Sequence, residues 1–216
     1  MKLIKNPLIV LSLITVACGL VTIIARDQRP FTIRGILRTR RQGLKLALTT
    51  RPGWAGWRWC LGLTIIYGIA ALPIGVLTGF LRKDMLAGRW GKFVRIALAL
   101  LIQPGLLEEL AFRALLLPHP GEGVSWRRTL VSAGAGLAAF ILYHPLNGLT
   151  LSPTARPLFT DWAFLLQAAL LGIACSAAYL ISGSIWPSIF MHWLPVTIWI
   201  LCFGGARRVA RSVRWI

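Results

Sequence analysis

Long apolar segments alternate with short segments that carry most of the charged residues of this 216-residue chain. A helix needs roughly 20 apolar residues to cross the hydrocarbon core of a bilayer, and it satisfies its own backbone hydrogen bonds in lipid. The pattern therefore predicts an all-α integral membrane protein, a bundle of about six transmembrane helices. The predicted spans are Pro7–Ala25, Trp59–Phe80, Phe93–Leu117, Thr129–His144, Trp162–Ile181 and Ile185–Phe203.

The composition agrees with this prediction, because the mean hydropathy is +0.70 and six residues are acidic. A soluble domain of this length would need far more polar surface to stay dispersed. The chain also leaves no room for such a domain beside the spans. We expect a multi-pass protein of the cell membrane or an inner membrane.

The net charge of +18 comes from basic residues that cluster between the apolar segments and in the C-terminal tail. Basic residues at the ends of spans contact anionic lipid headgroups. We therefore expect anionic lipid headgroups as partners and no binding of nucleic acid.

One basic segment, residues 26–58, predicts an amphipathic helix that lies on the membrane surface. The residues that carry this pattern are basic Arg34, Arg38, Arg41 and Lys45 and apolar Ile33, Ile36, Leu37, Leu44 and Leu48. Two glycines, Gly35 and Gly43, should weaken the helix.

Three charged residues, Glu108, Glu109 and Arg113, lie in the second half of the third predicted span. A charge at the bilayer centre costs roughly 2.5–3.5 kcal/mol, so these residues need a compensating role. Glu109 and Arg113 are four residues apart and meet on one helix face, which predicts an ion pair. Glu108 points about 100° away from Glu109 and has Phe112 at the same spacing. Because it lacks a partner in its own helix, Glu108 is the candidate for chemistry.

The histidines divide into one in a loop and two in or beside spans. His119 lies in the turn-rich stretch PHPGEG, where we expect a solvent-exposed surface residue. His144 and His192 lie in or near two later spans. Three helices can bring Glu108, His144 and His192 together around one water molecule.

Six of these intramembrane residues follow the pattern of a known family: Glu108, Glu109 and Arg113, then Phe140 and His144, then His192. In this order and spacing they resemble the CPBP family of intramembrane proteases, the CAAX-processing and bacteriocin-processing (Abi-type) enzymes. The resemblance covers about residues 93–203. It implies a helical bundle with a polar cavity that opens into the membrane, and peptide-bond hydrolysis by a glutamate-activated water.

The resemblance also implies a role for each matching residue. Glu108 would be the general base, His144 would help hold the water, and His192 would stabilise the tetrahedral oxyanion. The supporting residues would be Glu109, Arg113 and Phe140. These roles agree with what amide hydrolysis needs, which is a base, a positioned water and donors to the developing oxyanion.

One position departs from the family pattern. The family often has an asparagine four residues after the last histidine, as a second oxyanion donor, whereas this chain has Val196. Asn147 or Thr197 could supply the donor instead. On this interpretation the chain divides into N-terminal spans with a basic amphipathic loop (1–92), a CPBP-like catalytic core (93–204) and a basic tail (205–216).

Three alternatives use the same residues. Two histidines and a glutamate could ligate zinc, but the chain has no H-E-x-x-H motif, so we predict no cofactor and treat zinc as the alternative. Intramembrane Glu and His also form proton relays, although paired interrupted spans typical of transporters are missing. A non-catalytic assembly or protection factor is the third alternative, which Val196 favours. As a protease, the protein would act on a membrane-associated peptide or protein.

Overall fold

The computed structural model describes residues 33–210, and every regular element among them is a helix. The predicted first span, Pro7–Ala25, lies outside the described residues. The longer described helices are α2 (Ile33–Thr49), α3 (Trp54–Leu77), α4 (Trp90–Leu100), α6 (Trp126–Thr150), α8 (Trp162–Ser182) and α9 (Ile185–Cys202). The shorter ones are α5 (Leu107–Glu109), α7 (Arg156–Phe159) and α10 (Gly205–Ala210).

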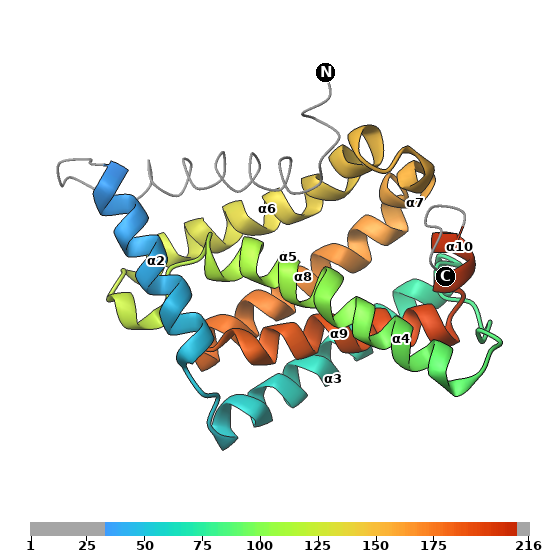
Figure 1. Ribbon diagram of the computed structural model, residues 1–216, viewed down its shortest axis with the longest axis horizontal. Coiled ribbons are helices and arrows are strands. Elements are labelled where there is room, and N and C mark those ends of the chain that lie inside the picture. The colour runs from blue at the N-terminus through green and yellow to red at the C-terminus, as the bar shows by residue number, and fades with distance from the viewer. Residues whose placement is uncertain (1–32, 211–216) are drawn as a thin grey trace.

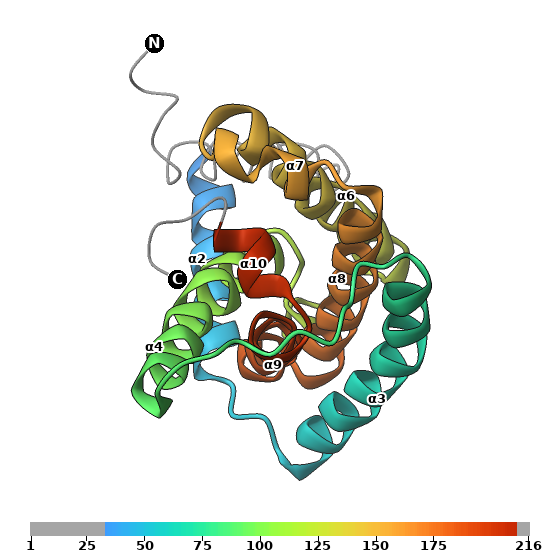
Figure 2. The same ribbon diagram turned by 90° about the vertical axis from the view of Figure 1, so that its right-hand side faces the viewer.

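Four helices are long and apolar enough to cross a membrane: α3, α6, α8 and α9. They run side by side with the kinked helix that contains α4 and α5 (Figure 1). The view along the bundle shows α9 near the middle, with α3, α4, α6 and α8 around it (Figure 2). The prediction of an all-α membrane bundle is confirmed.

The third predicted span is one helical segment with an interruption. After α4 the chain continues through a π-helical stretch, Leu101–Leu106, then α5, then a second π-helical stretch, Leu110–Ala114. Gln103 has non-helical dihedral angles (φ −133°, ψ 115°), and Pro104 follows it. Proline lacks the N–H that a helix needs at this point, and kinks of this kind are frequent at functional sites. The interruption lies about one turn before Glu108.

A tight turn joins α8 to α9. Gly183 has a positive φ of 65°, which suits glycine, and its N–H bonds to the carbonyl of Tyr179 at 2.8 Å. Ser184 then caps α9 by accepting from the N–H of Trp186. This turn makes the two helices antiparallel neighbours and places His192 beside the middle of α8.

Helix α2 crosses one end of the bundle, as Figure 1 shows. Arg38, Arg41 and Lys45 are exposed, as the amphipathic pattern predicts. Ala47 is fully buried in the core, and a β-carbon at Gly43 would come within 2.8 Å of Glu122 Oε1. Gly43 was expected to weaken the helix, and its small size instead allows α2 to approach the loop that follows the third span.

The opposite end of the bundle contains α10, whose residues belong to the predicted basic tail. Arg207 pairs with Asp84 at 2.8 Å, and Arg208 pairs with Asp161 at 3.1 Å. Arg208 also donates to the carbonyl of Gly79. These contacts join α10 to the loops before α4 and before α8.

Candidate active site

The predicted ion pair between Glu109 and Arg113 is confirmed. Arg113 Nη1 lies 2.9 Å from Glu109 Oε1, and the two side chains are 1% and 0% exposed. Arg113 also donates to the carbonyl of Gly172 at 3.1 Å, and its guanidinium lies 4.6 Å from the centre of the Phe140 ring. Because Gly172 has no side chain, α8 can approach the buried guanidinium closely. The cation is thus neutralised and hydrogen-bonded inside the bundle.

Glu109 has two further partners, which sequence reasoning missed. His192 Nδ1 lies 2.6 Å from Glu109 Oε1, and Ser188 Oγ donates to Glu109 Oε2. Ser188 also reaches the carbonyl of Cys175 at 3.0 Å. Ser188 precedes His192 by four residues and therefore shares its helix face, a spacing that could have identified it. Glu109 does more than neutralise Arg113, since it links the third span to α9.

The bond to Glu109 fixes the orientation of His192. A carboxylate only accepts, so Nδ1 carries the hydrogen and Nε2 is the ring nitrogen left for other contacts. His192 Nε2 lies 4.0 Å from Glu108 Oε2. Among the described residues, Glu108 Oε2 has no hydrogen-bond partner, although the residue is only 8% exposed. The two adjacent glutamates therefore differ as expected: Glu109 is fully paired and Glu108 is not.

His144 is oriented by the backbone of its own helix. Its Nδ1 lies 2.9 Å from the carbonyl of Phe140, which only accepts, so Nδ1 is the donor and Nε2 can accept. The Phe140 ring contacts both histidines edge-on, with ring centres 5.0 Å from His144 and 5.8 Å from His192. Phe140 thus packs against both imidazoles.

Glu108, His144 and His192 line one cavity of about 600 Å³. A cavity of this size falls within the range of roughly 300–1,000 Å³ typical of small-molecule sites. Most of the remaining wall is apolar and includes the aromatic residues Phe164 and Trp199. The structure thus brings the three candidate catalytic residues to one cavity, whose walls are less polar than the sequence suggested.

The residues at the candidate oxyanion positions lie in different surroundings. Val196 and Asn147 line the cavity. Asn147 Nδ2 is 3.4 Å from Tyr143 Oη, and its Oδ1 has no partner within the described part of the chain. Thr197 is buried but is not part of the cavity wall. Trp199, which sequence reasoning missed, lines the cavity with an indole N–H that has no acceptor in residues 33–210.

The expectation that His119 is solvent-exposed is wrong. The residue is 7% exposed, its Nε2 lies 2.8 Å from the carbonyl of Gly183, and its Nδ1 accepts from the N–H of Gly121 at 3.0 Å. Its loop folds over the turn between α8 and α9, where a buried carbonyl needs a donor. His119 therefore contributes to the packing of this end and lies outside the cavity wall.

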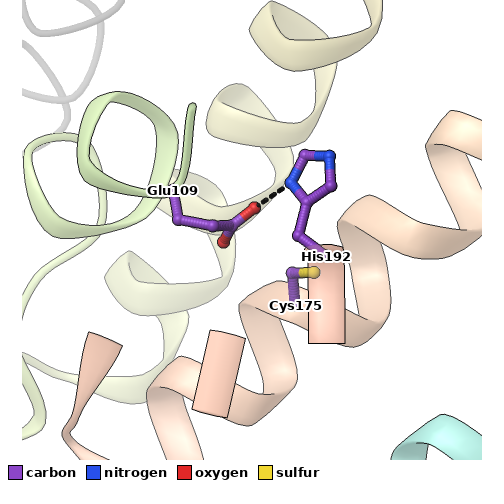
Figure 3. A group of neighbouring side chains, drawn as sticks. All are labelled: Glu109, Cys175 and His192. Atoms are coloured by element: carbon purple, nitrogen blue, oxygen red, sulfur yellow. Dashed lines mark hydrogen bonds and ion pairs between the residues drawn. The ribbon is translucent and has the colours of Figure 1, made fainter. Parts of the chain in front are cut away.

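One group of side chains has ligand atoms close enough to surround a metal ion. Glu109, Cys175 and His192 offer ligand atoms within 4.8 Å of one another (Figure 3). This set differs from the one predicted, which combined Glu108 with two histidines. The guanidinium of Arg113, 2.9 Å from Glu109 Oε1, opposes a cation there, and Glu109 already accepts from His192 and Ser188. These residues therefore fit an ion-pair network better than a metal site.

The comparison with protein families covers this region. Residues 90–198, just over half of the chain, match the Rce1-like family, described as type II CAAX prenyl endopeptidase Rce1-like. The chain belongs to this family. No curated protein and no solved structure matches it. The match confirms the resemblance to the CPBP proteases and spans all the residues that carried it, from Glu108 to His192. With its apolar helices, the chain is a multi-pass integral membrane protein of a peptidase family.

Proposed function

We propose that the protein is an intramembrane endopeptidase of the glutamic type, in which Glu108 activates a water molecule for attack on a peptide bond. The observation that carries this proposal is the buried, unpartnered Oε2 of Glu108, 4.0 Å from His192 Nε2 and in the same cavity as His144. An unpaired intramembrane carboxylate is costly, and residues of this kind commonly mark functional sites.

The hydrogen-bond acceptors of Glu108 and His144 support a position for this water molecule between the two side chains. The Glu108 carboxylate and His144 Nε2 both accept hydrogen bonds, because His144 Nδ1 donates to Phe140. A water molecule between them would donate one hydrogen to each and direct a lone pair into the cavity. This arrangement is what a general base needs.

The reaction then follows from the same groups. Glu108 takes a proton from the water as its oxygen bonds to the carbonyl carbon, which becomes a tetrahedral oxyanion. His192 stabilises this oxyanion through Nε2–H when its ring is protonated, while its Nδ1–H remains bound to Glu109. The C–N bond breaks as Glu108 returns the proton to the leaving nitrogen, giving a carboxylic acid and an amine.

The cavity supports a class of substrate. Its mainly apolar wall suits an apolar peptide segment that is anchored in or near the membrane. The family description names CAAX prenyl endopeptidases, so a prenylated peptide that ends in a C-a-a-X sequence is the first substrate to test. The same peptide without its prenyl group tests whether the lipid matters.

The test uses the full chain, purified and reconstituted in lipid, with both peptides in ¹⁸O-labelled water. Hydrolysis should give a product whose new carboxyl group contains ¹⁸O, as measured by mass spectrometry. Glu108→Gln and His144→Ala should each lower the rate by about 100-fold or more, as expected for loss of acid–base catalysis. The matched control Glu122→Gln replaces a carboxylate that does not line the cavity and should retain the rate.

Two results would reject the proposal. If Glu108→Gln cleaves as fast as the unchanged protein, another group is the base. If the unchanged protein cleaves none of a broad set of membrane-anchored peptides, while it increases the yield or stability of a co-expressed membrane protein, the non-catalytic alternative is correct. Val196, an apolar residue in the cavity wall, is the observation that favours that alternative.

A further inference from the structure

A second concave surface lies on the outside of the bundle, and we call it the outer groove. It has a volume of about 510 Å³, and all the residues that line it are apolar, aromatic or proline. The lining residues used here are Pro52, Trp57, Ile102, Leu106, Phe190 and Trp193. The outer groove therefore lies between the start of α3, the kinked third span and α9.

The outer groove and the catalytic cavity lie on opposite sides of the same two elements. In the third span, Ile102 and Leu106 line the groove, while Glu108 lines the cavity. On α9, Trp193 lines the groove and its neighbour His192 lines the cavity. Whatever fills the groove thus packs against the back of the wall that positions Glu108 and His192.

One end of the outer groove lies where membrane spans begin. Pro52 precedes α3, and Trp186 lies in the first turn of α9. Tryptophan at the ends of spans marks the headgroup level of a bilayer. Trp193, seven residues further along α9, lies about 10 Å deeper. The groove therefore extends from the headgroup region into the hydrocarbon.

The indole N–H groups of two tryptophans in the outer groove are already hydrogen-bonded to backbone carbonyls. Trp186 Nε1 donates to the carbonyl of Leu48 at 3.1 Å, and Trp193 Nε1 donates to the carbonyl of Ala97 at 2.8 Å. Both indoles are therefore fixed by backbone bonds and present ring surface to the groove. This surface suits a hydrocarbon chain better than a polar ligand.

Two arginines lie at the headgroup end of the outer groove. Arg51 and Arg58 are exposed, and each is the chain neighbour of a lining residue, Pro52 or Trp57. Among residues 33–210, neither makes an ion pair with an acidic side chain. Guanidinium groups bind phosphate oxygens in a bidentate manner. The groove thus combines an apolar channel with two cations at its outer end.

We propose that the outer groove binds an anionic phospholipid, with one acyl chain between α9 and the third span and its phosphate at Arg51 and Arg58. The occupant comes from the leaflet in which α3 and α9 begin, and the exposed Lys45 of α2 adds positive charge at this end of the bundle. By filling the groove, the lipid stabilises the positions of Leu106 and Trp193 and, through their neighbours, the catalytic wall. This inference concerns lipid binding and holds whether or not the chain hydrolyses peptides.

The test measures lipid binding directly. The full-length protein is delipidated in detergent and titrated with phosphatidylglycerol or phosphatidylcholine of identical acyl chains, and bound lipids are counted by native mass spectrometry. One phosphatidylglycerol should bind at a concentration roughly tenfold or more below that needed for phosphatidylcholine. The double variant Arg51→Gln/Arg58→Gln should lose this preference, and Arg51→Lys/Arg58→Lys should retain part of it.

Two further variants distinguish lipid binding in the outer groove from a general effect of surface charge. Lys83→Gln/Arg89→Gln removes two exposed cations between α3 and α4, away from the groove, and should preserve the preference. Ile102→Trp fills the groove and should reduce binding of both lipids. Equal binding of the two lipids by the unchanged protein, or equal losses in the two Gln pairs, would overturn the proposal and show that only bulk bilayer lipid covers this surface.

Discussion

Replacing the buried arginine or its partner should destabilise the fold, whereas replacing the neighbouring glutamate should not. The perturbations are Glu109→Gln, Arg113→Met and their combination, which remove charge and preserve side-chain size. Glu108→Gln is the matched comparison, because it makes the same chemical change one residue away. All four variants act within the same buried helical segment.

The contacts give the expected magnitudes. Either single variant leaves a buried charge without its partner, which typically costs about 3–5 kcal/mol. Arg113→Met also loses the 3.1 Å bond to Gly172 and the contact with the Phe140 ring. For a chain of this length each kcal/mol lowers Tm by about 2–4 °C. Each single variant should therefore lower Tm by about 6–20 °C.

The double variant distinguishes an ion pair from two unrelated losses. With both charges removed, no uncompensated charge is left, so its destabilisation should be smaller than the sum of the two singles. Glu108 Oε2 has no hydrogen bond to lose within the described chain. Glu108→Gln should leave Tm unchanged or raise it, while peptide cleavage is abolished.

The assay is thermal unfolding in one detergent, followed by tryptophan fluorescence, with cleavage measured on the same preparations. If Glu108→Gln lowers Tm as much as Arg113→Met, then all three charged residues form a structural network and the catalytic assignment of Glu108 is wrong. If the losses of the singles add fully in the double variant, the 2.9 Å pair does not stabilise the fold.

Three other measurements test the site. Purified protein should contain less than one equivalent of zinc and should cleave peptide in the presence of a chelator. Activity that is lost when metal is removed and restored by added zinc would reject the glutamic mechanism. Val196→Asn should raise the cleavage rate by about tenfold or more, because one oxyanion donor is worth roughly 2.7–4 kcal/mol, and an unchanged rate would mean that another donor is present. Ser188→Ala should lower the cleavage rate, because it removes a donor to the carboxylate that binds His192. Ser188→Thr retains the hydroxyl and should restore the rate, and equal rates in the two variants would contradict this role.

Sequence reasoning succeeded where geometry is local. The pairing of Glu109 with Arg113 depends on helix spacing alone, and the exposure of Arg38, Arg41 and Lys45 follows from one amphipathic helix. It failed for contacts between helices. The bond from His192 to Glu109 depends on how α9 packs against the third span, and the burial of His119 depends on how a loop folds over the turn at Gly183.

Helix ends were predicted less well than helix positions, and α6 shows why. Its predicted span ends at His144, one residue before Pro145, and proline usually terminates a helix. In the structure α6 continues to Thr150 with Pro145 inside it. A backbone that leaves the helix within a membrane finds no water to bind, so the helix tolerates the proline. This extension is what brings Asn147 into the cavity wall.

The scarcity of acidic residues gives the strongest physical reason for assigning chemistry to Glu108. With 24 basic residues against six acidic ones, an acidic side chain finds a cation or a donor unless the fold prevents it. Asp84 and Asp161 pair with α10, and Glu122 accepts from the backbone of His119. Glu109 has three donors. Among the acidic side chains of residues 33–210, Glu108 is the one with a buried oxygen that lacks a hydrogen bond. Two donors are nevertheless close: the guanidinium of Arg113 in the same helical segment, and the imidazole of His192 on the adjacent α9. Packing directs both of those donors to Glu109, and the carboxylate they leave unpaired is the one that lines the cavity.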